Sequence, residues 1–176
     1  MTPTPQPATK SDDQARATIL IRADPASVFR LFTEDIDRWW RSGLAYRVGK
    51  DRSMLHLEPK VGGRIYERFN LRHAGDDVKS ERVVQTGTIT HWEPPHRLCF
   101  EWRAVNFKPG ETTYVEVRFD PSPSGTLLTS THSGWSNIRA DHPARHGDPV
   151  GVFLRGLGMW WGSLLHSLRA QATNGR

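Results

Sequence analysis

The sequence predicts a single α+β domain in which a curved antiparallel sheet wraps a long C-terminal helix. Several central segments alternate apolar and polar residues with a period of two, which is typical of antiparallel strands with one covered face. Residues 149–170 instead place apolar residues three and four apart, as an amphipathic helix does. A one-sided sheet and an apolar-faced helix bury both faces by packing against each other.

The N-terminal segment has no apolar periodicity and contains three prolines, so we expect residues 1–15 to be a disordered tail. The remaining length fits one domain over residues 16–172. A β-prone segment, Ala17–Ile21, begins this domain. Asp24 then fits a helix N-cap and Pro25 the first helical turn.

Two short helices are predicted after the first strand. The apolar residues that follow Pro25 recur with helical spacing, and a second apolar group follows after a short acidic stretch. The first helix carries Val28, Phe29, Leu31 and Phe32, and the second carries Ile36, Trp39 and Trp40.

The middle of the chain is predicted to form the sheet. Gly62-Gly63 marks a turn into a strand, and the polar segment Arg72–Arg82 is predicted to be a loop. The alternation continues through three further segments. The predicted strands cover Arg64–Leu71, Arg97–Arg103, Thr113–Phe119 and about Thr126–Ser133.

The C-terminal helix follows a polar, proline-interrupted loop over Asn137–Asp148. Gly158 and Gly162 lie within the helix, where each costs about 1 kcal/mol relative to alanine. They indicate either tight packing on the sheet or room for a partner helix or ligand. The apolar face of the helix consists of Phe153, Leu157, Trp160, Trp161, Leu164, Leu165 and Leu168.

Composition restricts the classes of function. The formal net charge is +5, but the arginines are scattered, so a solvated surface is expected rather than a nucleic-acid partner. No stretch approaches the ~20 apolar residues of a membrane span, and no apolar run follows a basic start. Cys99 is the only cysteine, which excludes an intrachain disulfide and favours a cytoplasmic location. Alternation places Cys99 on the solvent face with no base beside it, so no thiol nucleophile is expected.

One segment resembles a known family. The run from Gly87 to Trp102 reads Gly-Thr-Ile-Thr-His-Trp-Glu-Pro-Pro-His-Arg-Leu-Cys-Phe-Glu-Trp. It resembles the Gly…Pro-Pro-x-Arg-Leu-x-Phe-x-Trp hairpin of the heat-shock-protein ATPase activator homologue family. That family belongs to the START-like, or polyketide cyclase and birch-pollen-allergen, superfamily. Further matching motifs, in order, are Asp24-Pro25-Ala26-Ser27-Val28-Phe29, Trp39-Trp40, Gly62-Gly63-Arg64 and Thr131-His132-Ser133-Gly134.

The resemblance covers roughly residues 16–170 and implies a helix-grip fold with a cavity between the sheet and the C-terminal helix. Superfamily members include lipid and hormone carriers, cyclases and chaperone activators. For this chain the resemblance therefore implies a START-like domain and leaves its activity open.

The covered faces of the sheet and the helix predict a ligand pocket. Aromatic side chains bring large apolar area of defined shape, as small-molecule pockets need, although core packing uses the same residues. If side chains fill this space completely, a protein-interaction role is favoured instead. The predicted lining residues are Phe100, Trp102, Val115, Val117, Phe119, His132, Leu157, Trp160, Trp161 and Leu164.

His132 is the main polar candidate, because it shares the covered strand face with Leu128 and Ser130. An imidazole there could hydrogen-bond a ligand or exchange a proton near neutral pH. The alternative is a structural histidine bonded to a neighbouring backbone group. We expect no metal or cofactor. The segment that carries Asp141, His142, His146 and Asp148 is interrupted by proline rather than helical, which does not suit zinc binding.

Three functional hypotheses follow. The first is a non-catalytic carrier or sensor of a small apolar or aromatic molecule. The second is a cofactor-free enzyme of the cyclase or hydrolase kind that uses cavity groups such as His132. The third is a chaperone-related protein-interaction module, which leaves a protein partner open.

Overall fold

The sheet contains every strand of the chain's described part. A computed structural model describes residues 13–40, 47–48, 53–71, 80–103 and 106–174. Within these ranges seven strands pair antiparallel in the order β1-β7-β6-β5-β4-β3-β2. The strands are β1 (Gln14–Ile21), β2 (Ser53–Leu57), β3 (Arg64–Leu71), β4 (Ser80–Glu93), β5 (Arg97–Trp102), β6 (Thr113–Ser122) and β7 (Gly125–Ser133).

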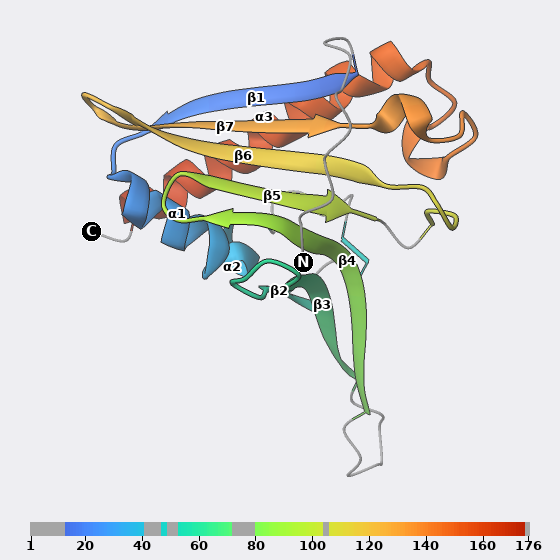
Figure 1. Ribbon diagram of the computed structural model, residues 1–176, viewed down its shortest axis with the longest axis horizontal. Helices are drawn as coiled ribbons and strands as arrows, with labels where there is room; N and C mark the ends of the chain where they lie inside the picture. The colour runs from blue at the N-terminus through green and yellow to red at the C-terminus, as the bar shows by residue number, and fades with distance from the viewer. Residues whose placement is uncertain (1–12, 41–46, 49–52, 72–79, 104–105, 175–176) are drawn as a thin grey trace.

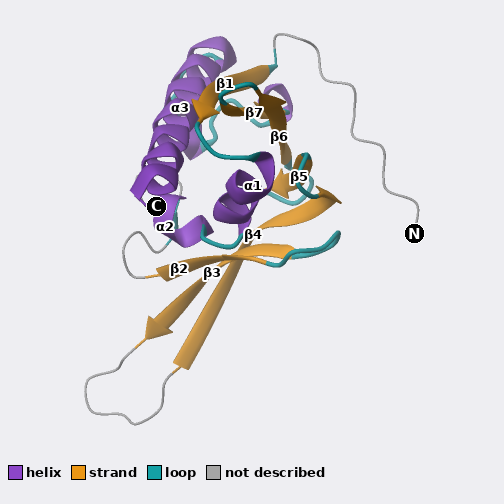
Figure 2. Ribbon diagram, turned by 90° about the vertical axis from the view of Figure 1, so that its left-hand side faces the viewer, coloured by secondary structure: helices purple, strands orange, loops and turns teal. Residues whose placement is uncertain are grey.

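Three α-helices lie on the covered side of this sheet in the described part of the chain. Figure 2 shows the long helix along one side, with the two short helices between it and the lower strands. The predicted helix-grip fold, with two short helices after the first strand and one continuous C-terminal helix, is confirmed. The described helices include none that combines the length and hydrophobicity needed to cross a membrane. The α-helices are α1 (Pro25–Thr33), α2 (Ile36–Trp40) and α3 (Val150–Asn174), and two 3₁₀ turns are η2 (Trp135–Asn137) and η3 (Pro143–Arg145).

The start of the domain differs from the prediction. Strand β1 begins at Gln14, so the disordered tail predicted over residues 1–15 extends too far. The Asp13 carboxylate accepts hydrogen bonds from the Ser136 backbone N–H at 2.9 Å and from its hydroxyl at 2.6 Å. These contacts anchor the start of β1 to η2. The rest of the predicted tail, residues 1–12, lies outside the described residues.

One loop prediction also needs correction. Strand β4 begins at Ser80, so the predicted loop over Arg72–Arg82 ends too late, and residues 72–79 lie outside the described part. The predicted loop over Asn137–Asp148 is irregular apart from the three-residue η3 turn and the end of η2, which agrees with the prediction. Strand β2 was not predicted, because a five-residue edge strand gives too short an alternation to stand out.

The sheet bends where β3 and β4 leave the main body. The β3–β4 register shifts at Ile65/Tyr66, and the β4–β5 register shifts at Ile89/His91. Such irregularities bend the strand that carries them and increase its twist. Gly87 lies between them, where an added Cβ would stand 2.7 Å from the Glu101 carbonyl oxygen. Figure 1 shows β3 and β4 extending away from the other strands beyond this point.

Helix α3 packs along β1 and buries one face over its length. Gly158 lies against the β1 backbone, since an added Cβ would be 3.6 Å from the Arg16 carbonyl oxygen. The helix therefore covers the edge strand, which would otherwise present unpaired backbone groups. Sheet packing thus explains Gly158 but not Gly162, where an added Cβ meets no atom within 4 Å. The buried residues of α3 are Phe153, Leu154, Leu157, Trp161, Leu164, Leu165 and Leu168.

These surroundings predict opposite effects for two glycine-to-alanine changes. We expect Gly162→Ala to raise the free energy of unfolding by about 0.5–1 kcal/mol, because helix propensity improves and the new methyl meets no neighbour. Gly87→Ala should lower it by about 1–3 kcal/mol, because the methyl collides with the Glu101 backbone. Urea denaturation measures both changes. Destabilisation by Gly162→Ala would contradict the packing of α3 described above.

Candidate functional site

The structure brings the predicted lining residues together in the space between sheet and helix. Nine of the ten are at most 4% exposed and belong to one continuous core cluster. Trp160 is the exception, being half-buried and packed against that cluster. The described side chains therefore pack closely where the pocket was predicted. Whether these residues contact a ligand stays a prediction.

Four tryptophans from three elements form what we call the indole cluster: Trp40, Trp102, Trp160 and Trp161. Trp40 lies at its centre. Its ring stacks on Trp102 with centroids 5.5 Å apart, and it meets Trp160 and Trp161 edge to face at 5.9 and 5.4 Å. Trp160 and Trp161 also meet edge to face, at 5.2 Å. Because Trp160 is half-buried, the cluster extends from the core to the molecular surface.

Trp40 is the member of this cluster that the pocket prediction missed. The sequence predicted it on the second short helix, but its side chain reaches strand β5 and helix α3. The Trp39-Trp40 pair was a usable signal, since two adjacent tryptophans are rarely both accommodated at a surface. Both prove to be at most 1% exposed.

A chain of hydrogen bonds links helix α3 to the sheet through His132. The Trp161 indole N–H donates to His132 Nδ1 at 3.2 Å, and His132 Nε2 lies 2.9 Å from the Thr113 hydroxyl oxygen. That hydroxyl donates to the Trp102 carbonyl at 3.1 Å, so its oxygen is free to accept. The Trp135 indole N–H also points at Nε2, at 3.1 Å, and a neutral imidazole accepts from only one of the two indoles. His132 is thus bonded to side chains on β6, η2 and α3, whereas its structural interpretation predicted a neighbouring backbone group.

Burial also determines the charge of His132. The side chain is 3% exposed, and desolvation of its charged form lowers the pKa to about 3. The imidazole therefore stays neutral at neutral pH. A group with this pKa is unsuited to exchanging a proton near pH 7, which was the catalytic interpretation of this residue.

A buried ionic cluster, absent from the sequence predictions, holds α2 against β2 and β3. Arg47 donates to the Asp37 carboxylate at 3.0 Å and to the Ser53 carbonyl at 2.9 Å. Asp37 Oδ1 also accepts from the Leu55 backbone N–H at 2.9 Å. Glu67 accepts from the Ser53 hydroxyl at 2.6 Å. Because Asp37 and Trp40 share α2, the cluster fixes the helix that carries the central indole.

Charge patterning alone could not reveal this cluster. Asp37 lies in the first turn of α2, where a carboxylate is commonly found because it interacts favourably with the helix dipole. Only the fold brings Arg47 and Glu67, twenty residues apart, to the same place, where their charged atoms are 3.9 Å apart and both side chains are 1% exposed. Ion pairs with so little exposure hold their elements in one arrangement, since separating them leaves buried charge unpaired.

Two other candidate residues, His142 and Cys99, are buried among protein groups. His142 is 1% exposed, and its Nδ1 accepts the Ala144 backbone N–H at 3.1 Å. Its ring meets Phe107 and Trp135 edge to face, and burial lowers its pKa. No group of three or more potential metal ligands is found in the described ranges. Cys99, expected on the solvent face, is only 1% exposed, and burial raises its pKa to about 11.

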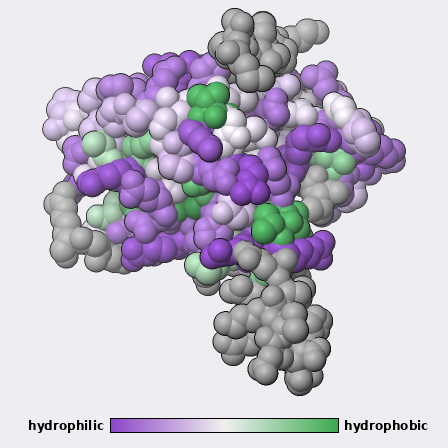
Figure 3. Space-filling view, turned by 60° about the horizontal axis from the view of Figure 1, so that its bottom comes forward, coloured by the Kyte–Doolittle hydropathy of each residue, from purple (hydrophilic) through white to green (hydrophobic). Residues whose placement is uncertain are grey.

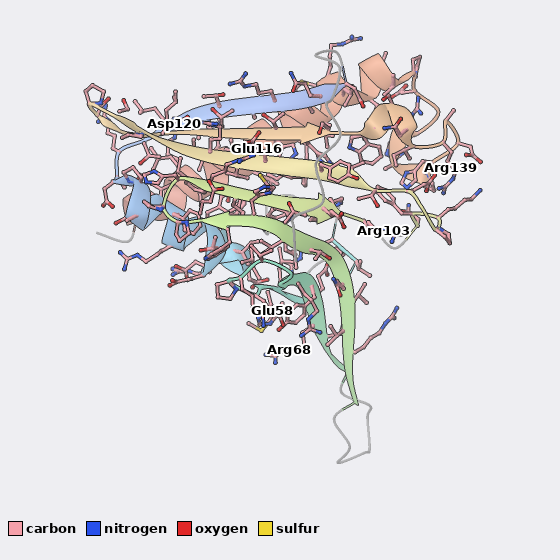
Figure 4. The ribbon with its side chains drawn as sticks, viewed as in Figure 1. Glu58, Arg68, Arg103, Glu116, Asp120 and Arg139 are labelled. Carbon is pink, nitrogen blue, oxygen red and sulfur yellow. The ribbon has the colours of Figure 1, made fainter. Side chains whose placement is uncertain are left out.

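The surface hollows formed by described residues lie away from the predicted lining residues. A groove of about 400 Å³ lies on β4 and β5 near Arg103, which Figure 4 labels. Another, of about 260 Å³, lies between the short helices and the end of α3, near Leu31 and Ala172. Figure 3 shows a mainly hydrophilic face with separate hydrophobic residues. The groove on β4 and β5 is lined by Gln85, Thr86, Gly87, Thr88, Glu101 and Arg103.

Comparison with known sequences finds one family. The sequence model described as Activator of Hsp90 ATPase homolog 1-like protein matches residues 22–159, well over half of the chain. No curated protein matches the sequence.

Solved structures share this fold at low sequence identity. A Nitrosomonas europaea protein superposes with a TM-score of 0.60 at 13% identity, covering 94% of this chain and 97% of its own. A Mesorhizobium loti protein gives 0.58 at 21% identity, covering 92% and 96%. A Plasmodium falciparum protein described as an HSP90 activator gives 0.56 at 21% identity, covering 90% and 94%. At these identities the likeness establishes the fold alone.

The buried ionic cluster predicts a strong effect of removing its cation. We expect Arg47→Leu to lower the free energy of unfolding by about 3–5 kcal/mol, because Asp37 and Glu67 then lose a buried partner. Arg64→Leu is the matched control, since the Arg64–Glu58 pair is solvent-exposed and should change stability little. Chemical denaturation compares the two variants. Equal losses in the free energy of unfolding would contradict a special contribution of the buried ionic cluster to stability.

The depressed pKa of His132 predicts acid sensitivity. The unfolded chain takes up a proton near pH 6.5 and the folded chain only near pH 3, so stability is complete above about 6.5 and falls below it. We expect a loss of about 1.4 kcal/mol per pH unit between about pH 6 and 4. His132→Gln should flatten this slope in denaturation series, and His166→Gln on the exposed face of α3 is the control. An unchanged slope in His132→Gln would exclude His132 as the responsible group.

Proposed function

The chain belongs to the Activator of Hsp90 ATPase homolog 1-like family, and from this premise we propose that it binds a small apolar or aromatic molecule between the sheet and helix α3. The ligand contacts the indole cluster and enters beside Trp160. This role is that of a carrier or sensor, in which the bound molecule leaves unchanged.

The indole cluster is the observation that supports this proposal. Trp40, Trp160 and Trp161 offer ring edges and faces to one another within 6 Å, so an aromatic guest could replace one of these contacts with an equivalent one. Trp160 is half-buried, whereas the other three rings are at most 4% exposed. A ligand can therefore reach the cluster by displacing one partly exposed ring rather than by opening the whole core.

The properties of His132 weigh against the cyclase or hydrolase alternative. A general acid or base works best with a pKa near the working pH, and that of His132 is lowered to about 3. Its ring nitrogens already face Trp135, Trp161 and Thr113. A binding role requires neither a proton transfer nor a free ring nitrogen.

The proposal predicts saturable binding of a neutral fluorophore such as N-phenyl-1-naphthylamine. We expect Trp160→Gln to raise the dissociation constant about tenfold, because the guest loses an aromatic contact worth about 1.4 kcal/mol. Met159→Gln is the matched control on the neighbouring exposed position, 73% exposed, and should leave binding unchanged. Fluorescence titration gives both constants. Equal effects of the two variants would contradict binding at the indole cluster.

A second candidate function is a protein-interaction module of the chaperone-activating kind. Close packing of the predicted lining residues favours it, as do the exposed apolar side chains Val152 and Met159 on one face of α3, 42% and 73% exposed. The Plasmodium falciparum relative is described as an HSP90 activator. Stimulation of an Hsp90 ATPase by this chain, without fluorophore binding, would favour this candidate over the first.

A further inference from the structure

Buried indole N–H groups lack acceptors in the described core, and from this we infer that its ligand is a neutral molecule with an acceptor oxygen, such as an aromatic ketone. The oxygen accepts the indole N–H of Trp40. This inference rests on the proposed function, because it names the chemical class of the molecule bound at the indole cluster.

The Trp40 indole N–H is a buried donor that lacks an acceptor in the described part of the chain. The side chain is 1% exposed, and its Nε1 has no hydrogen-bond partner among the described residues. Its neighbour Trp39, equally buried, donates its N–H to the Phe32 carbonyl at 3.2 Å. A buried donor without a partner is destabilising, and nearly all such groups in folded proteins are paired. A ligand oxygen at Trp40 removes that destabilisation.

Hydrogen-bond counting at His132 gives a second, independent excess of donors. The indole N–H groups of Trp135 and Trp161 point at Nε2 and Nδ1, at 3.1 and 3.2 Å. A neutral imidazole carries a proton on one nitrogen and a lone pair on the other, so it accepts from only one of them. Whichever ring nitrogen carries the proton, one of these two indole N–H groups is left over. These indole groups thus favour a guest that accepts hydrogen bonds.

The charges in the described core favour a neutral guest. A charged ligand would need a buried counter-ion, because an isolated charge in an apolar interior is strongly disfavoured. The charged residues that are buried in the described part already bond to protein groups elsewhere. These are Asp13 to Ser136, Arg47 to Asp37 and Ser53, Glu67 to Val48 and Ser53, and Arg145 to the Ile138 and Asp148 carbonyls.

Three naphthalenes of similar shape test the inference on the full chain. They are 2-acetylnaphthalene, which carries a carbonyl, 2-isopropenylnaphthalene, which replaces it with an alkene, and 1-(2-naphthyl)ethylamine, which is cationic at pH 7. We expect the ketone to bind about five- to tenfold more tightly than the alkene, the effect of one hydrogen bond. The amine should bind weakest. If the site lacks a donor, the alkene should bind more tightly than the ketone, because removing the carbonyl from water costs more free energy.

Two variants locate the donor. Trp40→Phe keeps an aromatic ring but removes the N–H, so the ketone preference should disappear. Trp39→Phe removes an N–H that already has an acceptor and should keep the preference. The infrared carbonyl band of the bound ketone gives a readout in the unmodified protein. It should lie at lower frequency than in hexane, and Trp40→Phe, if folded, should restore the hexane value.

The outcomes separate this inference from the proposed function. Binding of all three naphthalenes without a ketone preference, or a carbonyl band at the hexane position, would overturn the inference and leave ligand binding standing. A preference that survives Trp40→Phe would assign the donor elsewhere and overturn the role of Trp40. Failure of every probe to bind would overturn both proposals.

Discussion

The hydrogen-bonded chain from Trp161 through His132 to Thr113 connects the helix to the sheet in the interior. Hydrophobic packing attracts α3 to the sheet but does not determine how far along the strands the helix lies, because apolar contacts have no direction. Two ring nitrogens with fixed bond directions do so. Leaving any of these buried groups unpaired is costly, so this arrangement excludes shifted packings of the helix.

The curvature of the sheet leaves a space beneath it that the helices must fill. A straight helix meets a curved sheet along only part of its width, here mainly along β1. The short helices fill the remainder, and α2 supplies Trp40 to the centre of the indole cluster. The Arg47 cluster holds α2 to β2 and β3, so charge at the bent end of the sheet positions an aromatic ring in the core.

Together these features give an interior that is lined by apolar rings and contains buried indole N–H groups without acceptors among the described residues. Indole rings provide contact area, and their N–H groups only donate. The neutral His132 accepts one of them, which leaves donors without partners in a region that lacks a free charge among the described residues. Such an interior supports our proposal of a small neutral ligand over the alternative of acid–base chemistry. Family membership alone would not distinguish these roles.

The sequence by itself determined the layered fold, because the periods of two and of 3.6 directly report which face of a strand or helix is covered. It thereby placed Trp102, His132 and Trp161 on buried faces, as the structure has them. Only the tertiary structure decided what these residues touch. The position of Trp40 against Trp102 and the pairing of Arg47 with Glu67 depend on contacts between elements far apart in the chain. Periodicity carries no information about such contacts, since it describes one element at a time, whereas hydrogen-bond balance and charge burial are properties of several elements packed together.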